Sequence, residues 1–359
     1  MLLSIRPAKF RRWSTTLLFL FTSISLYAIY SSYRHLNGLR FPPGPPTVNL
    51  VLASLTLKAS HKWTDFLTIP NITVITYIAD NPSAPYHPPA NKGNEAISYL
   101  TYLHDFYNDL PDISIFIHGS DSSWHIDGVL DHSTRQALNR LDLEEVRKRG
   151  YLNLRTSWEN ACPIWINTSI TLADPRFDEK LREEEPYIKG AIQEMFPRRK
   201  VPAGLASPCC SQFAVTKERI RSIPRAQYKS AIDWLMNTEL ESKISGRIWE
   251  HLWHWLFLKR EVDCPSEWRA LCVWYHICFE DEQDWVSLQE MEAKRYEFVK
   301  FHSAKLANGL QPGNKGAVSL REGIAKLDGV IEPWKSRAFE KGKDEAFRRK
   351  VAVDLYKEV

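Results

Sequence analysis

The sequence lacks the short motifs that identify the commonest enzyme chemistries. It has neither a G-x-x-x-x-G-K-[ST] phosphate loop nor a G-x-G-x-x-G loop, and it has no G-x-S-x-G elbow of a serine hydrolase. The C-x-x-C, D-x-D and H-x-x-x-H spacings that would indicate a metal site are also missing. A net charge of +4 is too small and too dispersed to indicate a nucleic-acid partner. A function therefore has to come from residues that the fold brings together.

An uncharged run near the N-terminus, residues 13–30, is long enough for a membrane helix, which needs roughly 20 residues. Trp13 and Tyr30 are suited to its two interfaces. The alternative is a cleavable secretory signal, but no A-x-A pattern follows the run. Basic residues precede it at Arg6, Lys9, Arg11 and Arg12, which predicts a cytosolic tail over residues 1–12. We expect a single-pass type II protein of the Golgi or endoplasmic reticulum, anchored by Trp13–Tyr30, with its bulk in the lumen.

The cysteine pattern fits an oxidising compartment. Six cysteines all follow the predicted anchor, at positions 162, 209, 210, 264, 272 and 278. We expect at least one disulfide among Cys264, Cys272 and Cys278, because these lie close together in the sequence. Two N-x-[ST] triplets, at Asn71 and Asn167, are glycosylation acceptors in such a compartment. The sequence also holds 13 tryptophans, which either stack on carbohydrate or, more commonly, fill a core.

The remaining chain divides by composition. Residues 31–47 are rich in proline and predict a semi-rigid stem. Residues 48–300 alternate apolar strands with amphipathic helices, which is typical of a parallel sheet covered on both faces. The predicted fold class is therefore an α/β, Rossmann-like luminal domain. Residues 301–359 are basic and weakly periodic, so we expect a peripheral, weakly structured tail.

The predicted strands span residues 49–55, 72–80, 113–118, 151–154 and 211–215. Ligands gather at the carboxyl ends of strands in such sheets. Asp80 ends the second strand, and His118, His125 and Asp127 lie in the loop after the third. Carboxylate and imidazole groups suit Mg²⁺, Mn²⁺ or Zn²⁺. The alternative is a polar loop whose Asp and Ser side chains form turns.

A later helix carries Glu250 and His254, four residues apart beside a tryptophan-rich stripe. These two are either a surface pair or a carboxylate at a cleft, where desolvation raises its pKa and suits it to act as a base.

Several strings carry a family resemblance: NKGNEAISYLTYLHDFYNDLPDISIFIHG, WH, GYLNLR, CP, CCSQFAV, GRIWEHLWHWLF and CVWYHIC. From about residue 48 to 278 the chain resembles the fungal family catalogued as domain of unknown function 3431. Its QFAV strand and its GR-x-x-E-x-L-W helix look like the distal half of A-fold glycosyltransferases. The resemblance implies a glycosyltransferase-like domain, although most metal-dependent members of that fold use the D-x-D that is missing here.

We therefore expect an enzyme that transfers sugar from a nucleotide-sugar donor, with Mn²⁺ or Mg²⁺, to a glycan or glycoprotein. Asp80 would contact the nucleotide. Asp127, with His118 or His125, would hold a metal-bound diphosphate or the donor sugar directly, and Glu250 would act on the acceptor. The alternatives are a non-catalytic luminal protein that binds carbohydrate or protein, and a metal-dependent hydrolase.

Overall fold

The computed structural model describes residues 25, 44–58, 61–308, 311 and 313–358. The predicted anchor, residues 13–30, lies outside these residues except for Ser25, and so does most of the stem. Among the helices described, none combines the length and the apolar character that crossing a bilayer requires. The chain divides into two units, residues 1–45 and 46–359, and the second unit holds both β-sheets described below.

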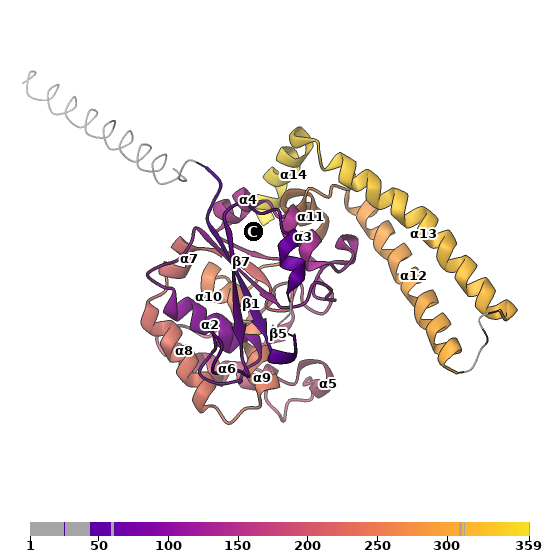
Figure 1. Ribbon diagram of the computed structural model, residues 1–359. Coiled ribbons are helices and arrows are strands. Elements are labelled where there is room, and N and C mark those ends of the chain that lie inside the picture. Colours follow the sequence, from indigo (N-terminus) through magenta and orange to yellow (C-terminus); the bar gives the residue numbers. More distant parts are fainter. Residues whose placement is uncertain (1–24, 26–43, 59–60, 309–310, 312, 359) are drawn as a thin grey trace, which may run out of the picture. The chain divides into compact units, whose positions relative to one another are not determined.

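A five-stranded mixed sheet, of order β2-β1-β3-β7-β4, forms the centre of the second unit (Figure 1). Its strands are β1 Val48–Ser54, β2 Ile72–Ile78, β3 Ile113–His118, β4 Tyr151–Asn153 and β7 Phe213–Thr216. β1 pairs in parallel with both β2 and β3, whereas β7 is antiparallel to β3 and to β4. β5 Ile166–Asn167 and β6 Gly204–Leu205 form a separate two-stranded sheet.

The expectation of a purely parallel sheet is wrong at β7. The chain leaves β4 at the edge where β1 and β3 end, and it begins β7 at that same edge, since Phe213 pairs with both Asn153 and Phe116. A strand that enters there must run antiparallel. The long connection between β4 and β7 therefore sets the direction of β7. The apolar pattern of such short strands does not reveal it.

Alternate strand residues face two separate hydrophobic cores. Val51 and Phe116 belong to a core that includes α2 (Glu95–Asp105), α8 (Arg225–Asn237), α9 (Ser242–Glu250) and α10 (Trp253–Leu258). Leu50 and Ile115 belong to a second core that includes α3 (Thr134–Arg140), α4 (Leu143–Arg149) and α11 (Glu267–Tyr275). Both faces of β1 are therefore buried, which explains its continuous apolar sequence.

The α-helices of the second unit are α2 Glu95–Asp105, α3 Thr134–Arg140, α4 Leu143–Arg149, α5 Glu179–Arg182, α6 Glu185–Met195, α7 Lys217–Arg221, α8 Arg225–Asn237, α9 Ser242–Glu250, α10 Trp253–Leu258, α11 Glu267–Tyr275, α12 Glu282–Ala307, α13 Lys315–Lys341 and α14 Glu345–Glu358. Short 3-10 turns are η1 Thr56–Lys58, η2 Lys62–Phe66 and η3 Gly128–Leu130.

Two helices, α3 and α4, follow each other directly between residues 134 and 149, because Asp142 begins a new helix after α3. Its carboxylate accepts hydrogen bonds from the backbone N–H groups of Glu144 and Glu145, which caps α4. Gly150 ends α4 with a φ of 82°, a left-handed conformation that favours glycine at the C-terminal end of a helix.

The basic segment from residue 301 onward is mostly helical in the structure. α12 and α13 pack along each other (Figure 1), and Phe298 lies against the backbone of Gly323. Val351 and Leu355 of α14 are buried in the second core. Tertiary packing therefore orders helices whose own amphipathic pattern is weak.

Three disulfides join the six cysteines, and the expected local bridge is confirmed as Cys272–Cys278. Cys162–Cys264 closes a loop of 102 residues, and Cys209–Cys210 joins neighbours. Trp249, Trp253 and Trp274 are fully buried, so these three tryptophans fill the core.

We predict that the double substitution Cys162→Ala/Cys264→Ala lowers the free energy of unfolding by about 4–5 kcal/mol, because a loop of about 100 residues regains its freedom in the unfolded chain. Both side chains are half-buried, so little packing is lost. Val262→Ala, an exposed change in the same loop, should alter it by less than about 0.5 kcal/mol. Equilibrium denaturation measures both. A loss similar to that of Val262→Ala would contradict the assignment.

Candidate functional site

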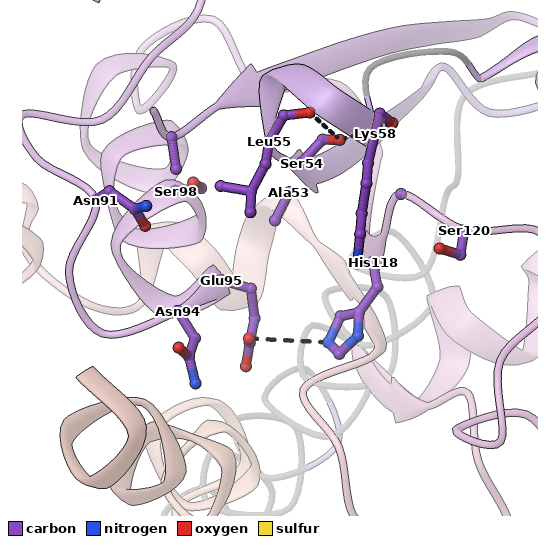
Figure 2. Close-up of a pocket in the computed structure, with 12 residues that line it drawn as sticks. Ala53, Ser54, Leu55, Lys58, Asn91, Asn94, Glu95, Ser98, His118 and Ser120 are labelled. Atoms are coloured by element: carbon purple, nitrogen blue, oxygen red, sulfur yellow. Dashed lines mark hydrogen bonds and ion pairs between the residues drawn. The ribbon is translucent and has the colours of Figure 1, made fainter. Parts of the chain in front are cut away.

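A cavity of about 280 Å³ lies at the carboxyl ends of the three parallel strands (Figure 2). It is lined by Ala53, Ser54, Leu55, Lys58, Ala79, Asn91, Asn94, Glu95, Ser98, His118, Gly119 and Ser120. β1 lies between β2 and β3, so β2 and β3 are added on opposite sides of β1 and the strand order reverses at this edge of the sheet. Open α/β sheets bind their ligands at such a point.

The 3-10 turns η1 and η2, which follow β1, support one wall of the cavity. The backbone N–H and hydroxyl of Thr56 donate to Asp80 Oδ1 over 2.7 and 2.9 Å, which ties η1 to the end of β2. His61 Nδ1 and Trp63 Nε1 donate to the carbonyl of Gly119 over 2.8 and 3.1 Å. A Cβ on residue 119 would lie 2.6 Å from the His61 ring, so only glycine allows this contact.

The start of α2 forms the opposite wall. Asn94 adopts a φ of 52°, a conformation that costs an ordinary residue free energy, and it packs against Gly246 of α9. Glu95 is the first residue of α2, and its side chain is 11% exposed. Its carboxylate Oε2 lies 3.9 Å from His118 Nε2, and Figure 2 shows the two side chains pointing toward each other. Glu95 and His118 therefore form a dyad across the cavity.

Gln212, which is fully buried just before β7, holds the histidine side of this dyad. Its amide oxygen accepts from the His118 backbone N–H, and its amide nitrogen donates to the His125 carbonyl. The Nδ1 atoms of His118 and His125 lie 3.0 Å apart, so one ring donates to the other. Burial lowers the pKa of His118 to about 4, and burial together with His118 and Arg155 lowers the pKa of His125 to about 3. Both rings are neutral at physiological pH.

Buried polar atoms without a hydrogen-bond partner gather around the cavity. Among the described residues these atoms include His61 Nε2, Glu95 Oε1, Ser98 Oγ, Tyr99 OH and His118 Nε2. Buried polar groups in folded proteins are almost always paired, because an unpaired group costs about 1–3 kcal/mol. A group of them beside one cavity indicates a site built for a polar ligand.

Glu250 is close to Glu95 but does not line the cavity. It ends α9, and burial raises its pKa to about 8, with further contributions from the charges of Glu95 and Glu184. Burial also raises the pKa of Glu95, and the Ser211 hydroxyl partly opposes this. Ionisation of one of these carboxyl groups therefore disfavours ionisation of the other. His254 lies in the next helix and forms a hydrogen bond with the Glu261 carbonyl, so of the two alternatives for Glu250 and His254 the surface pair does not form.

Asp127 has a structural position. It is 5% exposed, and its carboxylate accepts from the Thr156 backbone N–H, the Thr156 hydroxyl and the Ser157 backbone N–H over 2.8, 3.0 and 3.1 Å. Asp127 joins the loop after β3 to the chain after β4 and does not line the cavity. Burial raises its pKa, while the hydrogen bonds from Thr156 oppose the rise.

These positions do not fit a Mn²⁺ or Mg²⁺ site. The carboxylate of Asp127 is bonded to the protein, and His125 Nδ1 is bonded to His118. Across the described residues no group of three or more His, Cys, Asp or Glu side chains is arranged to hold a metal ion. Asp80 lies beyond the cavity wall, with one oxygen bonded to Thr56.

The family model described as "Protein of unknown function (DUF3431)" matches residues 50–273, more than half of the chain. The chain belongs to this family. No curated protein and no solved structure matches it. The segment shared with the DUF3431 family holds the cavity, the Glu95–His118 dyad and Glu250, whereas α12, α13 and α14 lie outside it. The site is therefore part of the family domain.

Sequence reasoning missed Glu95, Lys58 and Gln212. Glu95 lies in NKGNEA, where Gly93 has a φ of 69° and Asn94 is also left-handed. Two residues with positive φ directly before a helix point to a functional position. Such a backbone conformation costs free energy and persists only where the surrounding structure requires it. Gln212 gives no signal, since its partners His118 and His125 are 94 and 87 residues away in the sequence.

We predict that Asp127→Asn lowers the free energy of unfolding by about 1–3 kcal/mol, because an amide offers one acceptor oxygen where the carboxylate satisfies groups at both. Asp65→Asn, an exposed change, should have little effect. Chemical denaturation of both variants measures the difference. Equal stabilities would show that Asp127 does not hold the two loops together.

The raised pKa of Glu250 predicts a stability that depends on pH. The folded state keeps the proton that an unfolded glutamic acid, with a pKa of 4.5, has lost. This stabilisation is therefore complete below about pH 4.5 and is lost as the pH rises through about 8. We expect the melting temperature of the wild type to fall, relative to Glu250→Gln, between about pH 5 and pH 9. The exposed change Glu239→Gln should follow the wild type, and parallel curves for all three proteins would contradict the pKa shift.

Proposed function

We propose that this protein is a glycosyltransferase of the secretory pathway that transfers a sugar from a nucleotide-sugar donor to a hydroxyl of a glycan or glycoprotein. The observation that carries the proposal is the cavity at the carboxyl ends of β1, β2 and β3, with unpartnered polar atoms around it. A cavity of about 280 Å³ is at the lower end for small-molecule sites, so it would hold the reacting end of the donor.

Charge on the departing diphosphate has to be neutralised in such a reaction. The metal ligands expected from the sequence do not fit this role. Lys58 lines the cavity, and its ammonium group has no bonding partner within the described chain. We assign the diphosphate contact to Lys58, and the reaction then needs no divalent cation at this site.

The dyad supplies the proton transfer. A hydroxyl oxygen between Glu95 Oε2 and His118 Nε2, which are 3.9 Å apart, would lie within hydrogen-bond reach of both. The hydroxyl oxygen attacks the anomeric carbon, the bond from that carbon to the diphosphate breaks, and the hydroxyl proton passes to Glu95. Burial suits Glu95 to this work because it raises its pKa. The base role expected for Glu250 thus passes to Glu95, and Glu250 tunes it.

The proposed compartment rests on the sequence and the cysteines. The uncharged run at residues 13–30 would anchor the chain with its bulk in the lumen. Three disulfides agree with an oxidising environment.

Titration calorimetry of the purified full-length chain with UDP-glucose, UDP-N-acetylglucosamine and GDP-mannose, in EDTA, tests the proposal. We expect one donor to bind, and Lys58→Ala to weaken binding about tenfold or more through loss of a charged contact. Lys62→Ala, an exposed lysine outside the cavity wall, is the matched control. Glu95→Gln should keep donor binding and lose about 10²–10⁴ in transfer rate.

Three outcomes would overturn the proposal. Binding that requires Mn²⁺ would contradict the role of Lys58. Glycan hydrolysis without any nucleotide would select a hydrolase. Failure of every nucleotide sugar to bind a correctly folded chain would leave a luminal binding protein as the better interpretation.

A further inference from the structure

A second cavity, of about 330 Å³, shares no lining residue with the first. It is lined by Trp158, Cys264, Ser266, Glu267, Trp268, Arg269, Glu282, Trp285, Val286 and Glu358. These residues come from the loop after β4, from the segment before α11, from α11 itself, from the start of α12 and from the end of α14. Its three indole rings make it chemically unlike the first cavity.

Two of the indoles are fixed by hydrogen bonds to one short segment. Trp158 donates its backbone N–H to Glu267 Oε1 and its Nε1–H to the Pro265 carbonyl over 2.5 and 2.7 Å. Trp285 donates its Nε1–H to Glu267 Oε2 over 2.8 Å. The Cys162–Cys264 disulfide joins the same two loops. The rings are thus held in place before any ligand arrives, which lowers the entropy cost of binding.

The third indole has an unused donor. Trp268 is 9% exposed, and its Nε1–H has no acceptor within the described part of the chain. This group needs an oxygen, which a cationic ligand such as a quaternary ammonium does not provide. Trp268 lines the cavity, so a bound ligand could supply the acceptor oxygen.

The charges around the cavity exclude an anion. Glu267, Glu282 and Glu358 face a single guanidinium, Arg269, which is already paired with Glu358. The exposed carboxylate of Glu282 has no partner among the described residues, so it is available to accept hydrogen bonds from hydroxyl groups. A ligand that fits must be neutral, must carry both hydroxyl donors and acceptor oxygens, and must have an apolar face for indole rings.

We infer that this cavity is a saccharide-binding site, of a size for a mono- or disaccharide unit. The C–H face of a pyranose ring would lie on an indole, a hydroxyl or ring oxygen would accept from Trp268 Nε1, and hydroxyl groups would donate to Glu282. The inference stands apart from the proposed transfer reaction. In a transferase this site would hold a part of the acceptor glycan that does not react.

Saturation-transfer NMR of the full-length chain with methyl mannoside, N-acetylglucosamine, galactose and chitobiose tests the site, with tetramethylammonium as the cationic probe. We expect at least one sugar to bind and tetramethylammonium not to bind. Trp268→Phe keeps an aromatic ring and removes the donor, so it should weaken sugar affinity roughly three- to tenfold. Trp158→Ala should remove a stacking surface and abolish detectable binding. Trp165→Ala, a half-buried tryptophan outside this cavity, is the control for general loss of an indole.

Glu95→Gln separates this site from the first cavity. Sugar binding that survives Glu95→Gln and fails in Trp158→Ala supports the inference, even if no nucleotide sugar binds to the first cavity. Unchanged affinity in both Trp158→Ala and Trp268→Phe, preferential binding of tetramethylammonium, or no sugar binding by folded wild type would each overturn it.

Discussion

The parallel pairing of β1 with both of its neighbours is the constraint on which the site depends. The register places Ser54 beside Ile78 and Ala53 beside His118, so three strand ends stop along one line. The turns that leave this line supply Lys58, Glu95 and the loop after His118. Because β1 is buried on both faces, a slip of its register would expose one core and dismantle the cavity at the same time.

The antiparallel strand β7 contributes as much to the site as the parallel strands do. It begins at the edge where β3 ends, so the residues just before it, Ser211 and Gln212, arrive beside Glu95 and His118. Trp253 of α10 donates to the Ser211 hydroxyl from within the aromatic core. The aromatic core and the candidate site are therefore in direct contact, so a change in aromatic packing would shift the residues that support the dyad.

Local sequence predicts the helices and strands of this fold better than the tertiary contacts between them. Continuous apolar runs locate β1, β2 and β3 to within about two residues, since a strand buried on both faces needs no partner to be recognised. The same reasoning correctly directs attention to the strand ends, where His118 lies. The same reasoning wrongly assigns Asp127 to the site, because the Thr156 and Ser157 groups that donate hydrogen bonds to its carboxylate lie about 30 residues further along the chain. Glu95 looks like an ordinary first-turn helix residue, and its proximity to Glu250 depends on where α2 begins and where α9 ends.

The Cys209–Cys210 bridge gives the preparation of this protein a particular requirement. Cys210 and Ser211 both adopt left-handed backbone conformations, with φ of 91° and 50°, and Arg155 donates to the sulfur atoms. Gln212, which holds His118, comes directly after them. A chain produced in a reducing cytosol would present six thiols and lack the ring that joins residues 209 and 210. Its sheet could assemble from the same apolar strands while the support of the dyad relaxed, so soluble material alone would be a poor guide to an intact site. Expression through a secretory route is therefore part of obtaining an intact candidate site.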